Sequence, residues 1–145
     1  MNGRDSRNRA FTLIEILIVV VVLVILGAMV IPQFSDASTE AKTSALTTNL
    51  ATIRGQIQLY KLQHNDSYPT YATFTAQMMT YTDGSGNTNP SKTPTYKYGP
   101  YLSTTPNNPF TDTNTLSNDD TATTAWYYNQ TSGEFKANDG TYEAY

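Results

Sequence analysis

The sequence predicts an α+β protein in which one long N-terminal helix packs on a small antiparallel β-sheet head. Two observations lead to this prediction. A continuous apolar run, FTLIEILIVVVVLVILGAMVI, occupies residues 11–31, and a helical apolar pattern follows it as far as residue 60. The C-terminal part instead carries short segments rich in aromatic residues, separated by turn-forming residues, which is typical of β-strands.

The apolar run is long enough to cross a bilayer. As a helix, its 21 residues would measure about 31 Å at about 1.5 Å per residue, close to the thickness of a hydrocarbon core. It exceeds the apolar region of a cleavable secretory signal, roughly 7–15 residues, and no A-x-A cleavage site follows it. We therefore expect residues 11–32 to form a membrane helix, which Pro32 kinks or loosens where it leaves the membrane.

The first ten residues are basic. Arg4, Arg7 and Arg9 stand against one acidic residue, Asp5, and such segments remain on the cytoplasmic side of a membrane. We expect residues 1–10 to be a cytoplasmic leader and the rest of the chain to lie beyond a single membrane crossing. The whole chain has a net charge of −3, which argues against nucleic acid as the main partner.

Glu15 is the one charged residue in the apolar run. A charged side chain at the bilayer centre costs roughly 2.5–3.5 kcal/mol, so an acid in a membrane segment suggests a function. If the mature chain begins at Phe11, its α-amine lies four residues before Glu15, on the same face of the helix. With a pKa near 7.7, about the value for α-amines, this amine is largely protonated at neutral pH and is a suitable partner for the carboxylate.

The passage from the basic leader through Ala10 to the pentapeptide Phe-Thr-Leu-Ile-Glu, together with the apolar helix and Pro32, resembles the N-terminal signature of type IV pilins and type II secretion pseudopilins. The resemblance implies that a prepilin peptidase cuts between Ala10 and Phe11 and methylates the new amine of Phe11. It also implies that Glu15 pairs with the amine of a neighbouring subunit as a filament grows. The family usually has Gly before the cut, and Ala10 is the next smallest residue.

Residues 33–64 are expected to form an amphipathic helix. Its apolar residues recur at spacings of four and three, which places them on one face: Leu46, Leu50, Ile53, Ile57 and Tyr60. Turn-forming residues at 64–67 predict where the helix ends.

Residues 65–145 are expected to form a small globular head. The pattern predicts a short helix over 73–81 and strands over 96–102, 126–128 and 134–137. The passages 60–70 and 96–110 resemble the major pseudopilin of type II secretion, the G type. A long bipartite helix on such a head is the pilin fold, so the resemblance implies that architecture.

The sequence contains no recognisable catalytic set, and we expect the protein not to be an enzyme. It has no cysteine and one histidine, His64, which has no partner residues nearby for catalysis or metal binding. The tyrosines of the head are compatible with carbohydrate binding, but such residues more often pack a thin sheet with their hydroxyls in water.

Calcium is the one cofactor that the sequence suggests. Oxygen ligands gather at Asp112, Asn114, Asp119 and Asp120, and calcium takes six to eight oxygens, roughly, from flexible loops. The resemblance implies the same ion, because many major pseudopilins bind calcium between their last strands. The alternative is a solvated acidic loop that satisfies its own turns.

The resemblance implies a structural subunit of a type II secretion pseudopilus in the bacterial inner membrane, with its head on the periplasmic side. Its implied partners are copies of itself in a helical filament, the prepilin peptidase, the inner-membrane assembly platform, minor pseudopilins and, before assembly, membrane lipid. Two alternatives remain open. One is a type IV pilus subunit for adhesion, motility or DNA uptake, and the other is a membrane-tethered binding head.

Overall fold

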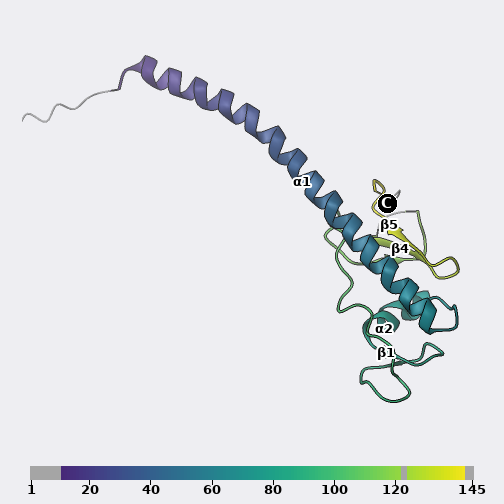
Figure 1. Cartoon of the computed structure of the whole chain (residues 1–145). Helices are drawn as coiled ribbons and strands as arrows, with labels where there is room; N and C mark the ends of the chain where they lie inside the picture. The colour runs from purple at the N-terminus through teal and green to yellow at the C-terminus, as the bar shows by residue number, and fades with distance from the viewer. Residues whose placement is uncertain (1–10, 122–123, 143–145) are drawn as a thin grey trace, which may run out of the picture. The chain divides into compact units, whose positions relative to one another are not determined.

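The computed structural model describes residues 11–121 and 124–142, apart from the side chains of residues 29–36. It contains both helices and strands, as Figure 1 shows, and confirms the predicted α+β class. The helical elements are α1 (Leu13–Gln63), η1 (Tyr71–Thr73) and α2 (Phe74–Met79), and the strands are β1 (Tyr81–Thr82), β2 (Thr88–Asn89), β3 (Leu116–Ser117), β4 (Trp126–Asn129) and β5 (Glu134–Ala137). The chain divides into two compact units, Met1–Glu40 and Ala41–Tyr145, and α1 contributes to both.

Helix α1 is one continuous element of 51 residues. It passes Pro32 without ending there, so the loosening predicted at this proline does not divide it into two helices. It ends at Gln63, immediately before the turn-forming residues. The large apolar side chains between Phe11 and Leu26 are exposed. Over the part of the chain that the structure describes, no helix is both long enough and apolar enough to cross a membrane.

The second unit contains two small sheets. β4 and β5 pair antiparallel, with Trp126 opposite Ala137 at one end and Asn129 opposite Glu134 at the other, which confirms the predicted hairpin. β3 joins the free edge of β4 in the parallel direction, so this sheet has the order β3-β4-β5. β1 and β2 form a separate antiparallel pair.

The prediction of a strand at 96–102 is wrong, because the structure has no strand there. Within it, Tyr98 makes an isolated bridge to Thr82, and the backbone then turns at Gly99, whose φ is 74°. A side chain at Gly99 would meet the carbonyl oxygen of Thr80 at 2.8 Å, so the turn requires glycine. Tyr101 N donates to the carbonyl of Met78 at 2.9 Å, and this segment therefore binds the end of α2 instead of a sheet.

The short helix predicted over 73–81 is present with shifted bounds. η1 and α2 together cover residues 71–79, while Tyr81 already belongs to β1. Phe74 and Met78 are buried on its inner face, as their spacing predicts.

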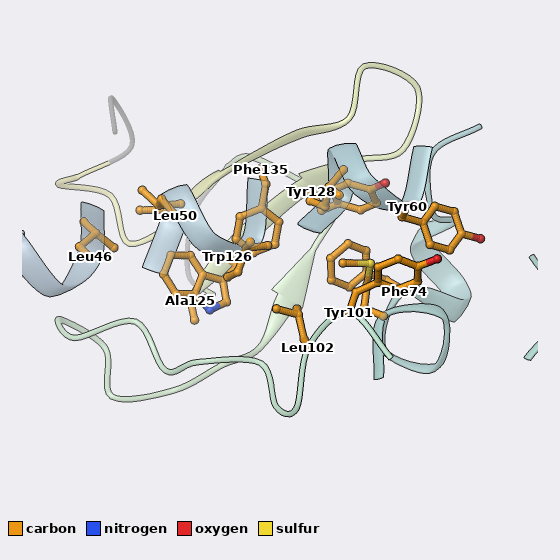
Figure 2. Packing of buried hydrophobic residues seen from close by; sticks show 14 residues of the cluster. Leu46, Leu50, Tyr60, Phe74, Tyr101, Leu102, Ala125, Trp126, Tyr128 and Phe135 are labelled. Carbon is orange, nitrogen blue, oxygen red and sulfur yellow. The ribbon is translucent and has the colours of Figure 1, made fainter. Parts of the chain in front are cut away.

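The core of the second unit lies between α1 and the β4–β5 hairpin (Figure 2). The predicted stripe on α1 is confirmed, because its four aliphatic members are at most 1% exposed and Tyr60 is 2% exposed. It packs in one cluster with the aromatic residues Phe74, Trp126, Tyr128 and Phe135. Burying one Leu or Ile side chain stabilises a fold by about 1.5–3 kcal/mol, so this face supplies much of the driving force for folding.

Polar atoms at the edges of the core hold the irregular segments in place. Tyr128 is fully buried and its hydroxyl donates to the carbonyl of Pro69 at 2.7 Å, while Trp126 Nε1 donates to the carbonyl of Pro106 at 2.9 Å. Arg54 Nε, from α1, donates to the carbonyl of Phe135 at 2.8 Å. Buried carbonyl groups need such partners, so these side chains fix the loops as well as filling the core.

Gly133, in the turn between β4 and β5, offers a test of this packing. Its φ is 73°, and a Cβ there would overlap the ring of Tyr68. We expect Gly133→Ala to lower the free energy of unfolding by about 1–3 kcal/mol, as measured by urea denaturation.

The matched control is Gly55→Ala in α1, where a Cβ would meet nothing within 4 Å. This change is expected to stabilise the chain by up to about 1 kcal/mol, because alanine favours helix over glycine. Equal stability of Gly133→Ala and the unmodified chain would contradict the proposed clash.

Candidate assembly site and acidic loop

Glu15 caps the helix in which it lies. Its Oε2 accepts a bond from the N–H of Thr12 at 3.4 Å, and its own N–H donates to Thr12 Oγ1 at 3.3 Å. This reciprocal pair is a capping box, which satisfies N–H groups that have no partner inside the helix. The positive end of the helix dipole also favours a carboxylate at this position. The contact therefore directs the Glu15 side chain towards the N-terminal end of α1.

The capping role of Thr12 was not predicted from the sequence. The signal was available, because Thr12-Leu13-Ile14-Glu15 has the spacing of a capping box immediately before an apolar run. The other predicted residues of this site are placed as follows. Phe11 is 74% exposed, Ala10 lies outside the described residues, and the side chain of Pro32 is not described.

The predicted calcium ligands lie in two separate groups. Asp112 and Asn114 contact the preceding loop: the carbonyl of Asp112 accepts a bond from Asn107 Nδ2 at 3.3 Å, and Asn114 Nδ2 donates to the carbonyl of Thr105 at 3.3 Å. Asp112 has a φ of 54°, in the left-handed region. These two residues therefore stabilise a turn of their own.

Asp119 and Asp120 contact other partners. Asp119 Oδ1 accepts bonds from the hydroxyl of Thr121 at 2.7 Å and from its N–H at 3.0 Å, and these bonds hold the pKa of the Asp119 carboxyl below its usual value. Asp120 Oδ2 lies 3.8 Å from Lys136 Nζ. Among residues 11–121 and 124–142, no three Asp, Glu, His or Cys side chains converge in a way that would hold a metal.

Asn138 is a residue beside this loop that sequence analysis did not select. It is 1% exposed, and its Nδ2 donates to the hydroxyl of Thr124 at 2.7 Å and to the carbonyl of Asp119 at 3.1 Å. Its Oδ1 is buried without a hydrogen-bond partner among the described residues. An unpaired buried acceptor costs about 1–3 kcal/mol, and an amide oxygen is a suitable ligand for calcium. This orphaned oxygen fits a hard cation, although the carboxylates do not converge on it.

His64 is a buried structural residue in this fold. It is 2% exposed, its Nδ1 lies 2.7 Å from the carbonyl oxygen of Tyr60, and its Nε2 lies 3.0 Å from Thr82 Oγ1. A carbonyl can only accept, so Nδ1 carries a hydrogen and donates it to Tyr60. Both nitrogens are therefore occupied by structural bonds.

Comparison with known proteins addresses the N-terminal site. The family described as the prokaryotic N-terminal methylation motif matches residues 5–31, a range that includes Ala10, Phe11 and Glu15. The chain is 35% identical over 65 residues to type II secretion system core protein G of Klebsiella pneumoniae, which covers 45% of this chain and 46% of that protein. It is 40% identical over 63 residues to the protein of the same name from Pseudomonas aeruginosa, covering 43% and 44%.

The N-terminal part of the chain therefore resembles the type IV pilins and type II secretion pseudopilins. A further relative is the type IV major pilin protein PilA of Myxococcus xanthus, 48% identical over 46 residues, or 32% of this chain and 21% of that protein. The matches span less than half the length of these relatives. No solved structure matches the chain.

For this pilin-like chain, calcium binding at the acidic loop stays a prediction. If the loop binds the ion, we expect millimolar calcium to raise the melting temperature of the full chain. An ion that binds only the folded state adds about 2.7 kcal/mol at a concentration one hundred times its Kd. Asp119→Asn should remove this rise in melting temperature, because it removes the charge of one of the predicted ligands.

Asp83→Asn is the matched control, because the Asp83 carboxylate lies in the β1–β2 loop and accepts its bonds from Ser85 and Asn87. In this variant, calcium should raise the melting temperature as much as it does in the unmodified chain. An unmodified chain whose melting temperature does not move in millimolar calcium would leave residues 112–120 as ordinary turns.

Proposed function

We propose that this chain is a structural subunit of a type II secretion pseudopilus. The observation that supports the proposal most is the combination of the methylation motif at residues 5–31 with similarity to relatives named type II secretion system core protein G. The exposed apolar side chains from Phe11 to Leu26 need a cover in water. Lipid would cover them before assembly, and the helices of neighbouring subunits would cover them in a filament.

The proposal assigns a part to each segment of the chain. Residues 1–10 would be a cytoplasmic leader, residues 11–32 the segment held in the inner membrane and later in the filament core, and residues 33–64 the helix that carries the head. The head, residues 65–145, would lie in the periplasm. The partners would be other copies of the chain, the prepilin peptidase, the inner-membrane assembly platform and minor pseudopilins, and the chain itself would not be an enzyme.

Glu15 would set the axial register between subunits. Within one chain its carboxylate accepts a long bond of 3.4 Å from Thr12 N, which leaves it able to take a stronger donor. In the filament that donor would be the α-amine of Phe11 of an adjacent subunit. Leaving one partner of a buried charge pair unpaired costs about 3–5 kcal/mol, so each wrong offset between subunits carries this penalty.

A type IV pilus subunit is the second candidate function. It is favoured by the 48% identity over 46 residues to a major pilin, a stretch that is shorter than the matches to core protein G. Deleting the gene separates the two candidates. Loss of protein secretion with intact surface pili supports the pseudopilus, and loss of pili with intact secretion supports the pilus.

Processing is the first property to test. We expect the mature protein to begin at Phe11, because the basic leader, the small residue Ala10 and the FTLIE stretch form the cleavage signature. The intact mass of the protein extracted from cells with an active prepilin peptidase should lack residues 1–10 and carry one added methyl group. A full-length mass from such cells would contradict the cleavage.

The second test separates the charge of Glu15 from its capping role. Glu15→Gln keeps the capping box, since glutamine also accepts at this position, but it removes the charge. If the charge pair sets the register, Glu15→Gln and Glu15→Ala should both be cleaved normally and both fail to enter filaments when each is the only copy. Filaments are scored by shear fractionation and electron microscopy.

Glu134→Ala is the matched control, because Glu134 is an exposed acid on β5. It should assemble like the unmodified chain. Normal filaments from Glu15→Gln but not from Glu15→Ala would assign the defect to the helix cap and refute the charge pair. Normal filaments from both variants would refute any role of Glu15 in register.

A further inference from the structure

A polar cavity of about 350 Å³ lies in the head, where α1 ends. Its walls come from the last turn of α1, the turn that follows, α2 and the β1–β2 loop, and they include Tyr60, Asn65, Ser67, Gln77 and Ser85. Among the described residues, those lining this cavity carry hydroxyl, amide, imidazole or glycine groups and no carboxylate, ammonium or guanidinium. A ligand of this cavity would therefore be neutral and would be recognised through hydrogen bonds.

The Tyr60 hydroxyl is the unusual group in the cavity wall. The residue is 2% exposed and its ring stacks on His64 with 3.7 Å between the ring centroids. Figure 2 shows its hydroxyl at the edge of the core, pointing away from the packed side chains. Among the described residues, this hydroxyl has no hydrogen-bond partner, in contrast to the buried hydroxyl of Tyr128. Asn138 Oδ1, and not this hydroxyl, is the enclosed polar atom without a partner among the described residues, so the Tyr60 hydroxyl reaches the cavity and is open to a ligand.

The fold keeps this hydroxyl open towards the cavity. Gly86 lies beside it with a φ of 82°, and a Cβ at this position would come within 2.7 Å of the Tyr60 oxygen. Burial raises the pKa of Tyr60 to about 12, with smaller contributions from Tyr101 and Asp83. The hydroxyl is therefore protonated at physiological pH and is available as a donor.

The other buried groups of the wall are held by the protein itself. Gln77 is 6% exposed, its Oε1 accepts from the N–H of Thr70 at 2.8 Å, and its Nε2 donates to the carbonyl of Gly86 at 2.9 Å. His64 uses both ring nitrogens in the same way. A rigid wall with one open donor is pre-organised, which lowers the entropy lost on binding.

Two charged groups near the cavity, Asp83 and Lys61, each have a partner within the protein. The Asp83 carboxylate accepts bonds from the backbone and side chain of Asn87 and from Ser85 N, so it serves the β1–β2 loop. Lys61 Nζ donates to the hydroxyl of Tyr68 at 3.3 Å. Among the described residues, no charged side chain lines the cavity itself, which favours a neutral ligand over an anionic one.

We propose that this cavity binds a neutral saccharide. Each sugar hydroxyl both donates and accepts, which matches a wall of exposed Asn65, Ser67 and Ser85 side chains around the Tyr60 donor. Small-ligand sites begin at roughly 300 Å³, so the cavity has room for one or two sugar rings. The inference goes beyond the proposed filament function and does not depend on it, because it concerns residues of the head alone.

The experiment uses the full chain, purified in a detergent without a sugar headgroup, because maltoside or glucoside detergents would compete. The probes are maltotriose and chitotriose, which distinguish a glucan from an N-acetylglucosamine glycan such as that of the cell wall. Binding is measured by calorimetry and by saturation-transfer NMR at up to about 10 mM ligand. Glucose 6-phosphate and triglycine amide are the charged and the peptide controls.

We expect at least one of the two saccharides to bind and both controls to fail. Tyr60→Phe should weaken binding about 3–10-fold, the loss typical of one hydrogen bond, without lowering the melting temperature, because no partner in the described residues loses a bond. Asn65→Asp adds a charge at nearly constant size and should weaken binding as well. Tyr71→Phe is the matched control: its hydroxyl donates to the carbonyl of Leu116, outside this cavity, and binding should not change.

Four outcomes would overturn the proposal. The first is that neither saccharide binds, and the second is that Tyr60→Phe binds the saccharide as tightly as the unmodified chain does. The third is that glucose 6-phosphate binds as tightly as the saccharides, and the fourth is that triglycine amide binds and the saccharides do not. The last of these would assign the cavity to a peptide. Because the assay does not involve filaments, a chain that fails to assemble can still bind, and failure of one proposal leaves the other standing.

Discussion

The structure of the second unit depends on the burial of one helix face. Its longest strands have four residues and its two sheets have two and three strands, which is close to the smallest sheet that is stable in water. The chain has no cysteine, so no disulfide holds the unit together. The aliphatic stripe of α1 supplies the missing surface by covering Trp126, Tyr128 and Phe135. The head therefore uses the helix as its scaffold, and the helix turns that carry the stripe become part of the head.

The aromatic residues explain how such a small core fixes so much irregular chain. Between β2 and β3 the backbone makes no strand among the described residues, so its buried carbonyls need side-chain donors. Trp126 provides one through Nε1, and Tyr128 provides another to the segment before η1. Each of these residues fills the core with its ring and fixes a loop with its polar atom. Tyr60 has a similar location at the edge of the core, but its hydroxyl has no such partner within residues 11–121 and 124–142.

The parts of the fold that the sequence predicts are those specified by local periodicity. The stripe of α1 and the β4–β5 hairpin each extend over enough residues to show a period of 3.6 or 2. The segment 96–102 was predicted to be a strand because its tyrosines alternate. Its conformation depends instead on backbone hydrogen bonds to the carbonyl of Met78, which is distant in the sequence. β3 has two residues and pairs in parallel with β4, for which the sequence carries no local signal. The acidic loop shows the same limit: its aspartates are visible in the sequence, but the orphaned Oδ1 of Asn138 emerges only from tertiary packing.

The capping box changes how the proposed role of Glu15 works. A carboxylate on an exposed helix face would sample several rotamers, and pairing with another subunit would cost the entropy of selecting one of them. In this chain the bond to Thr12 N already holds the carboxylate at the N-terminal end of α1. The incoming amine of a neighbouring subunit would therefore meet an oriented acceptor, and it would replace a long neutral donor with a charged one. Under the proposed function, folding and assembly would use the same carboxylate in succession. The weakness of the cap is then a useful property, because a stronger bond within the chain would compete with the bond between subunits.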